Sequence, residues 1–487
     1  MANGKVYLIG AGPGDPGLLT LKAHELLSSA EVVVYDRLVG EEIMAMIPPT
    51  ATLINVGKHA GDHPVPQHRI NEILVEEAQK GHQVIRLKGG DCFVFGRGGE
   101  ELEELCRYDI PFEVVPGITS AIAAPAYAGI PVTHRDFCSS LHIITGHKQK
   151  DGLLNLDYDA LVRLNGTLIF LMSVASVGEI AAGLLKAGME PSTDCAVIEN
   201  GTRPQQRKFV SSLETIEETV RRNEVQSPAI ILVGRVCSLS DSFDWFDRLP
   251  LKGRRILVTR PKNAASRLAD RLRALGAAVS LAPAIETLPL PFAVPDFSLY
   301  SALVFTSAAG VHAFFAGLFE HGFDSRRLSG CLLAAVGPQT AKALRHYGLC
   351  ADFVPKEYTG SALGDELCKS GLLKEGKRVL IPRAAEAAPE LTDHLQANHI
   401  AYDVLPVYHT VMTLSLPFAK EDFDVVTFTS ASCVENFSHC LSGDLSQVTA
   451  LCIGPKTAEK ARELGMQVIL SKEASIDSMI ETLINRG

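Results

Sequence analysis

Residues 6–17 read VYLIGAGPGDPG, an apolar run followed at once by a loop of glycine and proline. A short β-branched run before a glycine-rich loop is typical of a strand that ends at a ligand site in an α/β sheet. The dinucleotide fingerprint G-x-G-x-x-G fits the first two glycines but fails at its third position, which is Asp15. Pro13 and Pro16 lack N–H groups and Asp15 is negatively charged, so the loop is poorly suited to a phosphate. We therefore expect a neutral or cationic nucleoside.

The composition is that of a globular protein with several domains. Its 487 residues are too many for one hydrophobic core, which predicts two to four domains. The net charge of −10 argues against a nucleic-acid-binding protein that relies on positive potential. The 11 cysteines include no C-x-x-C pair, which favours reduced thiols over disulfides or structural zinc. The chain has no leader-like start and no long apolar run, so we expect a cytoplasmic protein without a membrane span.

Short β-branched runs alternate with amphipathic helical patterns, which predicts α/β layers with largely parallel sheets. In the first half we expect strands at residues 6–10, 32–36, 84–88, 142–145, 168–172, 195–199 and 230–234. A helix is expected over 67–80, where apolar residues share one face.

Two breaks divide the chain. The Pro-Gly pair in FEVVPG, residues 112–117, separates two expected lobes. The stretch 238–255 follows neither a helix nor a strand period and mixes Ser, Asp, Pro and Gly, which is typical of an ordered linker. We therefore predict a first domain over 1–240 with lobes of about 1–115 and 118–240, a linker over 241–252, and a second domain over 253–487.

The second half contains an internal duplication. VFTSA at 304–308 recurs as TFTSA at 427–431, VGPQTA at 336–341 as IGPKTA at 453–458, and ILVTRP at 256–261 is echoed by VLIPR at 379–383. The three landmarks recur in the same order and much farther apart than the repeats of a solenoid. We expect two α/β lobes with a cleft between them.

Several stretches of the first half lie in loops that follow expected strands, where ligands bind in open α/β sheets. They are GAGPGDPG (10–17), YDRLV (35–39), GKHAG (57–61), LKGGDCFVFGRG (87–98), VPGITS (115–120) and GIPVTHRD (129–136). In this order they resemble the tetrapyrrole methylases, and among these the uroporphyrinogen-III C-methyltransferases, over about residues 4–238.

This resemblance implies S-adenosylmethionine as methyl donor, a nucleoside with a cationic sulfur and no phosphate, and it implies no metal. Matching positions imply that the donor is bound by Pro13, Gly89, Gly90, Asp91, Val94, Thr119, Ser120, Met172, Gly201 and Ala229. Glycines permit close backbone approach, and the Asp91 carboxylate can accept hydrogen bonds from the ligand. Taken alone, Asp91 is more typical of a turn or helix cap. Cys92 stands where the family generally has proline, and His59 replaces a common arginine.

The implied reaction transfers two methyl groups to ring carbons of uroporphyrinogen III and gives precorrin-2. Asp36 and Lys58 are the implied active-site pair: Asp36 accepts a proton or stabilises the cationic ring, and Lys58 holds a substrate carboxylate. From the residues alone, Asp36 is also typical of a strand-end cap or a ribose ligand. Further cations that could meet substrate carboxylates, or simply face solvent, are His134, Arg135, Lys148 and Arg203. Prolines lie among His59, His63 and His68, which argues against a metal site there.

The duplicated half resembles the uroporphyrinogen-III synthases over about residues 253–487. The family pattern implies one lobe of about 253–284 plus 411–487, with the other lobe between them. Hydroxyls and free N–H groups at helix starts can hold a polyanion such as hydroxymethylbilane. The expected substrate contacts are Thr306, Ser307, Thr340, Thr429, Ser430 and Thr457, each of which is also typical of a helix cap. Tyr408 matches the tyrosine that the family implies in loss of the substrate hydroxyl, and it is equally typical of packing.

The two resemblances predict consecutive reactions and therefore a bifunctional enzyme, which cyclises hydroxymethylbilane and methylates the product toward sirohaem and cobalamin. One alternative is a methylase of another corrin intermediate with a non-catalytic tetrapyrrole-binding second half. The methyl acceptor could also be RNA or diphthine, and the second half could be a binding module or regulator without turnover. A dinucleotide-dependent dehydrogenase is a weaker alternative. Methylases of this type are dimers, so we expect a homodimer without nucleic-acid or membrane partners.

Overall fold

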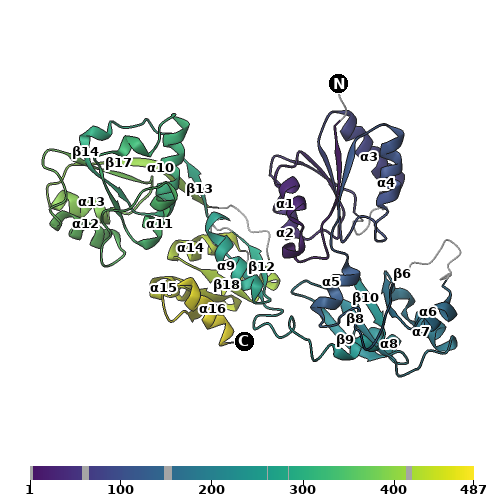
Figure 1. Ribbon diagram of the computed structural model, residues 1–487. Helices are drawn as coiled ribbons and strands as arrows, with labels where there is room; N and C mark the ends of the chain where they lie inside the picture. The colour runs from purple at the N-terminus through teal and green to yellow at the C-terminus, as the bar shows by residue number, and fades with distance from the viewer. Residues whose placement is uncertain are drawn as a thin grey trace. The chain divides into compact units, whose positions relative to one another are not determined.

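The computed structural model describes residues 4–57, 65–146, 156–259, 262–282, 285–412, 419–441 and 443–486 (Figure 1). The chain divides into two compact units, of which the first holds most residues up to Arg254 and the second most residues from Arg255 onward. Each unit contains two five-stranded sheets. This confirms the expected fold class of two successive two-lobed α/β units.

The first lobe of the first unit is a five-stranded parallel sheet in the order β3-β2-β4-β1-β5. Its strands are β1 (Val6–Gly10), β2 (Val32–Tyr35), β3 (Thr52–Asn55), β4 (Val84–Lys88) and β5 (Phe112–Val115). Its helices are α1 (Leu21–Ser28), α2 (Glu41–Met44), α3 (Gln67–Gln79) and α4 (Gly98–Arg107). Helices α1 and α2 cover one face of the sheet and α3 and α4 the other (Figure 1). Burial of both faces explains why these strands are continuous apolar runs.

The strand register of this lobe decides what meets at its carboxyl edge. Gly10 pairs with Lys88 and Tyr35 with Leu87, while Ile9 pairs with Val115. The loops that follow four strands therefore start at one level of the sheet. Parallel sheets bind ligands at this edge.

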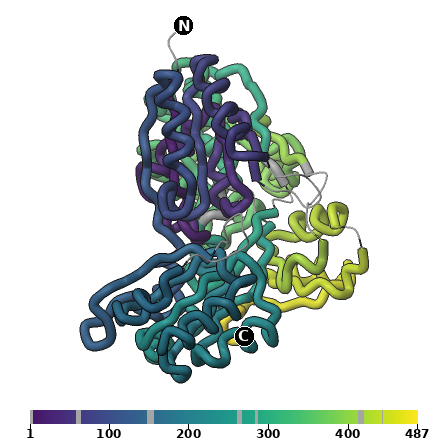
Figure 2. Tube along the Cα trace, turned by 90° about the vertical axis from the view of Figure 1, so that its right-hand side faces the viewer, coloured from purple at the N-terminus to yellow at the C-terminus, as the bar shows by residue number. Residues whose placement is uncertain are grey.

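The second lobe has a mixed sheet in the order β6-β7-β10-β8-β9. Its strands are β6 (Leu141–Thr145), β7 (Thr167–Leu171), β8 (Asp194–Glu199), β9 (Arg207–Ser212) and β10 (Ala229–Val233), and its helices are α5 (Ser120–Tyr127), α6 (Tyr158–Leu164), α7 (Val177–Lys186) and α8 (Ile216–Arg222). Only β6 and β7 pair in parallel. The expectation of largely parallel sheets is wrong for this lobe, because β8 returns directly as β9 through residues 200–206 without a crossover helix. Figures 1 and 2 show the two lobes as separate bodies, with α5 at their junction.

Residues 241–252, the predicted linker, pack on the first unit. Trp245 and Phe246 each place their ring 4.9 Å from the ring of Tyr127 at the end of α5. The Trp245 indole N–H donates to the carbonyl of Ala126 at 3.0 Å. Lys252 Nζ donates to the carbonyl of Gln206, between β8 and β9, at 2.9 Å. These contacts fix the segment against the second lobe.

The second unit holds two further sheets. The first, in the order β12-β11-β18-β19-β20, consists of β11 (Arg255–Val258), β12 (Ala278–Leu281), β18 (Val425–Phe428), β19 (Thr449–Cys452) and β20 (Gln467–Leu470). Its helices are α9 (Lys262–Ala274), α14 (Ala431–Cys440), α15 (Pro455–Glu463) and α16 (Ile476–Ile484). The second sheet, in the order β13-β17-β16-β14-β15, consists of β13 (Ile285–Pro289), β14 (Tyr300–Phe305), β15 (Leu332–Ala335), β16 (Arg378–Ala384) and β17 (Tyr402–Met412). Its helices are α10 (Ala308–Glu320), α11 (Pro338–His346), α12 (Gly360–Lys369) and α13 (Glu390–Ala397).

The internal duplication has a direct structural counterpart. The repeated landmarks fall on β11, β18 and β19 in one lobe and on β16, β14 and β15 in the other. In each sheet these three strands are neighbours in that order, paired in parallel. The repeated sequences thus occupy equivalent places in two similar lobes.

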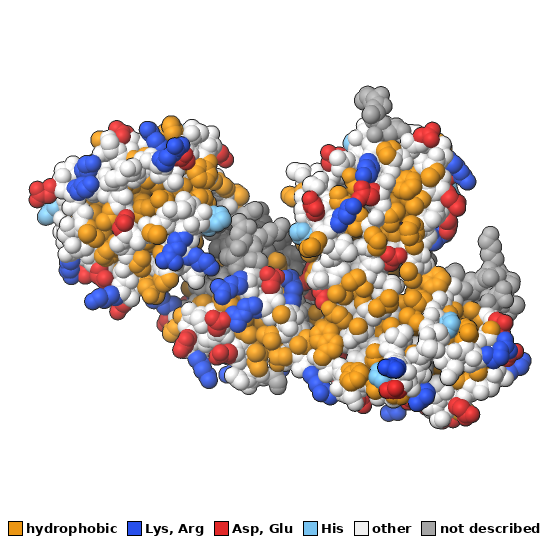
Figure 3. Space-filling model, viewed as in Figure 1, with side chains coloured by type: hydrophobic (Ala, Val, Ile, Leu, Met, Phe, Trp, Pro, Cys, Tyr) orange, Lys and Arg blue, Asp and Glu red, His pale blue; other side chains and the backbone are white. Residues whose placement is uncertain are grey.

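All seven strands expected in the first half are present, two with the predicted bounds and five with ends shifted by one residue, and the helix expected over 67–80 ends at Gln79. Three strands were not expected, namely β3, β5 and β9. They form the edges of their sheets, and β3 and β9 carry exposed polar residues that weaken the apolar signal. On the face drawn in Figure 3, Lys and Arg side chains are interspersed with Asp and Glu over both units. Within the described ranges, every helix is too short or too polar to cross a bilayer.

Candidate functional sites

The opening glycine loop is tied to the loop after β4. Ala11 N–H donates to the carbonyl of Lys88 at 2.7 Å, and Gly12 and Gly90 exchange backbone hydrogen bonds of 3.1 and 2.8 Å. Gly12 and Gly90 adopt φ of 75° and 70°, in the left-handed region that favours glycine. The loop is thus an extension of the sheet rather than the first turn of a helix. The expectation that this loop suits a neutral or cationic nucleoside better than a phosphate stays a prediction.

Three loops cross at glycines, two of which leave no room for a side chain. A Cβ on Gly117 would lie 2.2 Å from the carbonyl oxygen of Gly90, and a Cβ on Gly10 would lie 2.5 Å from the nitrogen of Gly117. On Gly90 itself a Cβ would meet nothing within 4 Å. The crossing therefore packs backbone against backbone on one side of Gly90 and leaves open space on the other, where a ligand can approach.

Asp91 organises this crossing. Its Oδ1 accepts the N–H groups of Phe93 and Val94 at 2.8 and 3.1 Å, and its Oδ2 accepts the N–H of Gly117 at 3.1 Å. This is the turn-capping role that Asp91 suggests when taken alone. Oδ1 already accepts two hydrogen bonds, whereas Oδ2 accepts one and keeps a further lone pair, so the predicted contact with the donor stays a prediction.

Apolar side chains are exposed around the same edge. They belong to loops that follow β2, β4 and β5 and to the first turn of α5, and they are Leu38, Phe93, Phe95, Ile118 and Ile122. Phe95 also has a φ of 53°, and in the second lobe Met172 has a φ of 55° with 53% of its surface exposed. Non-glycine residues in this conformation concentrate at functional sites, because the surrounding structure must hold them there.

The opening loop is also bound to the second lobe. The N–H of Asp15 donates to Thr202 Oγ1 at 3.2 Å, and the Tyr127 hydroxyl donates to Asp15 Oδ2 at 2.6 Å. Burial and the Asp15 carboxylate raise the pKa of Tyr127. Arg203, considered above as a substrate ligand, instead donates to the carbonyl of Leu38 at 2.9 Å. The negative charge in the glycine loop thus serves as a contact between lobes.

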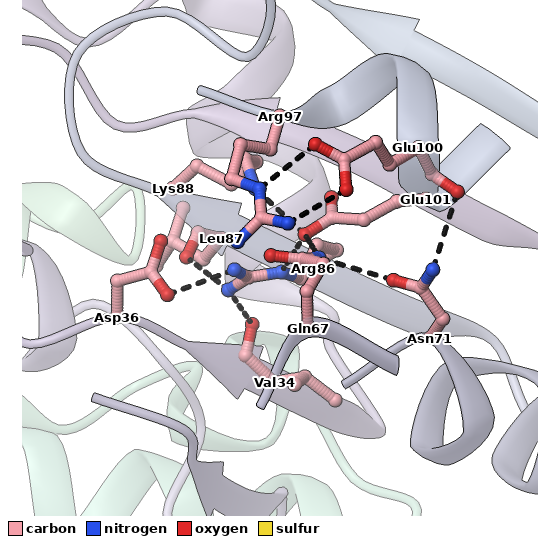
Figure 4. Close-up of polar contacts among 10 residues, drawn as sticks. All are labelled: Val34, Asp36, Gln67, Asn71, Arg86, Leu87, Lys88, Arg97, Glu100 and Glu101. Atoms are coloured by element: carbon pink, nitrogen blue, oxygen red, sulfur yellow. Dashed lines mark hydrogen bonds and ion pairs between the residues drawn. The ribbon is translucent and has the colours of Figure 1, made fainter. Parts of the chain in front are cut away.

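Four ionisable side chains of the first lobe form what we call the buried charge cluster: Asp36, Arg86, Lys88 and Glu101 (Figure 4). Arg86 lies between the two carboxylates, with Nε 3.0 Å from Glu101 Oε1 and Nη2 2.8 Å from Asp36 Oδ1. Lys88 Nζ donates to the same Glu101 oxygen at 2.7 Å. Asp36 is the accessible end of the cluster, with 30% of its side chain exposed, whereas the exposure of Glu101 is 0%.

Burial acts on the two cations with different outcomes. Burial by itself disfavours the charged form of Arg86, but the charges of Glu101 and Asp36 outweigh it and raise the pKa of the guanidinium. The pKa of Lys88 is lowered, first by burial and then by the charge of Arg86. The cluster therefore holds Arg86 firmly as a cation.

The other predicted donor contacts lie on several elements. Thr119 caps α5 by accepting the N–H of Ala121 at 3.3 Å, and Ser120 is the first residue of that helix. A Cβ on Gly201 would lie 2.3 Å from the Cβ of Ala124, so this glycine packs on α5. Pro13 lies in the opening loop, half-buried, whereas Ala229 begins β10 with 9% of its surface exposed. The structure thus brings the predicted residues of the first lobe together around the glycine crossing.

Four residues named above, Lys58, His59, His63 and Lys148, lie outside the described residues. Arg135 is exposed, and His134 accepts the N–H of Asp136 through Nδ1 at 3.2 Å. Among the side chains that the structure describes, no three of His, Cys, Asp and Glu gather as metal ligands.

In the second unit, the repeated serines begin helices at the carboxyl ends of strands. Ser307 caps α10 by accepting the N–H of Gly310 at 2.9 Å, and Ser430 caps α14 by accepting the N–H of Cys433 at 3.2 Å. Thr306 and Thr429 precede them, half-buried. The capping role is thus realised, and the predicted contact of these hydroxyls with substrate stays a prediction.

The repeated Gly-Pro pairs stand at the starts of α11 and α15: the glycine is the N-cap, without a side-chain hydrogen bond, and the proline is the first helical residue. Thr340 and Thr457 lie inside these helices with 4% and 5% of their surface exposed. The two hydroxyls are therefore poorly accessible, and their predicted contact with substrate stays a prediction.

Tyr408 lies at the carboxyl edge of the second lobe. Its hydroxyl is 3.0 Å from Ser307 Oγ, and 9% of its surface is exposed. Arg383, near the end of the neighbouring β16, donates from Nη1 to the carbonyl of Ala388 at 3.1 Å. Among the residues that the structure describes, its buried Nε has no hydrogen-bond partner.

Sequence reasoning missed Arg86, Lys88, Glu101 and Arg383. The signal for the first two was present: Arg86 and Lys88 interrupt a strand that is otherwise apolar and was expected to be buried. A charge in such a strand requires a partner. Nothing in the sequence assigns Glu101, because three other acidic residues stand on the same helix.

Two family models match the chain. That of the tetrapyrrole (corrin/porphyrin) methylases matches residues 5–217, and that of uroporphyrinogen-III synthase HemD matches residues 266–481. A curated relative, a porphyrin biosynthesis protein HemD from Ruminiclostridium josui, is 47% identical over 500 residues, which cover 100% of this chain and 99% of that protein.

Further relatives match the first unit. The S-adenosyl-L-methionine-dependent uroporphyrinogen III methyltransferase of Methanosarcina barkeri is 54% identical over 242 residues, which cover 49% of this chain and 94% of that protein. A solved structure of uroporphyrin-III C-methyl transferase from Thermus thermophilus, complexed with S-adenyl homocysteine, is 40% identical and covers 48% of this chain and 93% of that chain, with a TM-score of 0.42. The chain belongs to the tetrapyrrole methylases through its first unit and to the uroporphyrinogen-III synthases through its second, and it is an enzyme that joins the two.

Proposed function

We propose that the chain cyclises hydroxymethylbilane to uroporphyrinogen III in its second unit and methylates that product in its first. S-adenosylmethionine is the methyl donor, two methyl groups are transferred, and the product is precorrin-2. The proposal rests chiefly on one observation: one chain carries both families along its length, and their reactions are consecutive. The named methyltransferase relatives support the donor and the acceptor.

The glycine crossing is suited to the methyl donor. It offers the half-buried backbone of Gly89 and Gly90 and open space beside Gly90. The exposed apolar side chains nearby match the flat faces of an adenine and of pyrrole rings. When bound, S-adenosylmethionine supplies an electrophilic methyl group on a positively charged sulfur.

Methyl transfer to a pyrrole carbon creates a need for a base. The carbon forms a bond to the methyl group as the methyl–sulfur bond breaks and its electron pair stays on sulfur. The alkylated ring system is cationic and becomes neutral by losing a proton. Asp36 is the proposed acceptor, because its carboxylate lies at the carboxyl edge and only one of its oxygens is bonded to Arg86. Lys58 is the proposed partner for a substrate carboxylate.

The second unit is proposed to hold its linear substrate through many individually weak hydrogen-bond donors. The N-termini of α10, α11, α14 and α15 follow the repeated strands and present free N–H groups, to which the partial positive charge of each helix adds. Tyr408, bonded to Ser307, is proposed to assist departure of the hydroxyl as water by donating its proton. Arg383 adds one full positive charge near the same edge.

Mass spectrometry of the full chain supplied with hydroxymethylbilane and S-adenosylmethionine tests this function. We expect a cyclic type III product whose mass is raised by two methyl groups. A type I product that forms at the uncatalysed rate would instead support a non-catalytic second unit. Methylation of other corrinoids but not of uroporphyrinogen III would support the alternative acceptor. Sedimentation of the same protein checks the expected homodimer.

A further inference from the structure

The buried charge cluster lies in the middle of the first sheet. Arg86 and Lys88 belong to β4, which is flanked by β1 and β2, and both side chains are buried. Removing two cations from water costs several kcal/mol each, and replacing such a cluster by apolar residues is often neutral or stabilising. Stability alone is therefore a poor reason for the cluster, and its accessible end, Asp36, lies at the proposed site of methyl transfer.

Glu101 holds both cations through a single oxygen. Its Oε1 accepts from Arg86 Nε at 3.0 Å, from Lys88 Nζ at 2.7 Å and from Gln67 Nε2 at 3.2 Å (Figure 4). Its Oε2 has no hydrogen-bond partner in the described parts of the chain. Glu101 thus concentrates its negative charge on the side of the two cations.

Arg86 connects Glu101 to Asp36 by bonding both carboxylates. Its guanidinium is planar, so the bond from Nε to Glu101 fixes the direction in which Nη2 points, which is toward Asp36 Oδ1. Nη1 lies within 3.4 Å of the carbonyls of Val34 and Leu87, which hold the same plane. Arg86 therefore binds Asp36 through Oδ1 only, and within the described residues Oδ2 accepts no hydrogen bond.

The charges within the cluster balance, because two cations face two carboxylates. Without the charge of Glu101, Asp36 would be the single counter-charge for both Arg86 and Lys88. Both cations would then be drawn to Asp36 and would occupy the oxygen that is otherwise free.

We propose that Glu101 is a positioning residue for methyl transfer: it orients Arg86 and confines Lys88, so that Asp36 keeps one carboxylate oxygen available to accept the proton. This inference rests on the proposed function and adds Arg86, Lys88 and Glu101 to it. None of these three touches the substrate.

Charge-balanced variants of the full chain test the inference. Single-turnover methyl transfer from S-adenosylmethionine to uroporphyrinogen III is measured for Glu101→Gln, Lys88→Met and the double variant. Glu101→Gln leaves two cations facing one carboxylate, and we expect its rate to fall about tenfold or more. The double variant restores balance with one cation and one carboxylate, and we expect a rate within about threefold of the wild-type rate. A double variant slower than both single variants would overturn the inference, since that is the behaviour of a merely structural cluster.

A second arm asks whether Glu101 acts through Asp36. In an Asp36→Asn background, Glu101→Gln is expected to change the rate less than about twofold, because the group that it positions is already lost. Full additivity would overturn the inference. If Asp36→Asn leaves a rate too low to measure, Asp36→Glu takes its place. If Asp36→Asn methylates at the wild-type rate, the assignment of Asp36 as proton acceptor fails, and this outcome is distinct from a missing rescue.

Controls separate positioning from folding. Glu104→Gln makes the same change on α4, where Glu104 pairs with the exposed Arg107 at 2.7 Å, and we expect it to leave the rate unchanged. Melting curves and calorimetry with S-adenosylhomocysteine report whether each variant folds and binds. If Glu101→Gln alone does not fold, the comparison of the double variant with Lys88→Met decides, and an equal or lower rate in the double variant counts against the inference.

Discussion

The proposed sites of the two units lie at the same place in an α/β sheet, the carboxyl edge, but they consist of different kinds of residue. In the first unit the carboxyl edge is fixed by crowded glycines and by buried ionised side chains that end in Asp36. In the second unit the corresponding edges carry hydroxyl-capped helix starts, and Gly454, before α15, has open space where a Cβ would stand. The difference follows the proposed chemistry: one proton must be taken at one atom in the first case, and a long polyanion must be held by many weak contacts in the second.

The largest effect is expected at the reacting group. Asp36→Ala should lower methyl transfer by about a hundredfold or more, because a positioned base is lost. Cyclisation should stay within about twofold, since it belongs to the other unit. The two rates are measured on one preparation by product analysis. Equal loss of both activities would remove the basis for comparing two independent sites.

The crowded glycines give the next largest effect. Gly117→Ala would place a Cβ 2.2 Å from the carbonyl of Gly90, and we expect a destabilisation of the first unit of about 1–3 kcal/mol together with loss of S-adenosylhomocysteine binding. Gly99→Ala is the matched control in α4, with nothing within 4 Å, and it should stabilise by about 0.5–1 kcal/mol. Urea unfolding measures both.

Gly454→Ala extends this test to the second unit. We expect a destabilisation smaller than that of Gly117→Ala: a Cβ there meets nothing within 4 Å, so only the weaker N-cap preference of alanine counts. A loss of stability as large as that of Gly117→Ala would erase the contrast between a crowded and an open edge. The same urea experiment gives the answer.

The duplicated lobes permit a comparison within the second unit. Ser307→Ala and Ser430→Ala each remove a helix cap and should cost about 1 kcal/mol of stability. Only Ser307→Ala also removes the partner of the Tyr408 hydroxyl, so we expect the larger fall in cyclisation rate from this variant. Equal rates for the two variants would separate Tyr408 from the reaction.

The smallest effect concerns cysteine chemistry at the glycine crossing. Burial raises the pKa of Cys92 to about 12, so this thiol is protonated and shielded at pH 8. Alkylation of the folded protein followed by peptide mass spectrometry should label the exposed Cys106 and Cys350 and leave Cys92 unmodified. Rapid labelling of Cys92 would show that the loop opens readily.

The raised pKa of the Cys92 thiol also predicts that the stability of the protein depends on pH. The pKa of Cys92 is raised above its ordinary value near 9, so stability falls as the pH rises above that value, where the unfolded chain ionises and the folded chain does not. The loss ends as the pH passes about 12. Melting temperatures from pH 8 to 10 are expected to fall more for the wild-type chain than for Cys92→Ala.

The sequence sufficed for the alternation of strands and helices, the duplication, and the loops that carry glycine. It did so because central parallel strands such as β1 and β4 are buried on both faces and read as apolar runs. Edge strands such as β9 expose polar residues and were missed. The antiparallel pairing of the second lobe could not be predicted, since it depends on which strands become neighbours.

The sequence could indicate where site residues lie where residue type alone limits the choice, while their roles stay predictions. The glycines of the crossing and Asp36 follow from motifs at strand ends. The partners of Asp36 did not follow, because the pairing of Arg86 with Glu101 is set by how α4 packs on β4, and the other acidic residues of that helix look the same in sequence. Capping by Asp91 and Ser307 could be stated only as an alternative, because ligand and cap use the same oxygen atoms.

The chain has a single tryptophan, Trp245, which packs on Tyr127. Because Tyr127 in turn bonds Asp15 in the opening loop, this indole is connected to the proposed donor site by two contacts. Its fluorescence emission therefore comes from the first unit alone, without label or mutation. Quenching or a spectral shift on addition of nucleoside would give a direct optical titration of that unit within the intact enzyme, in the presence of an occupied or empty second unit.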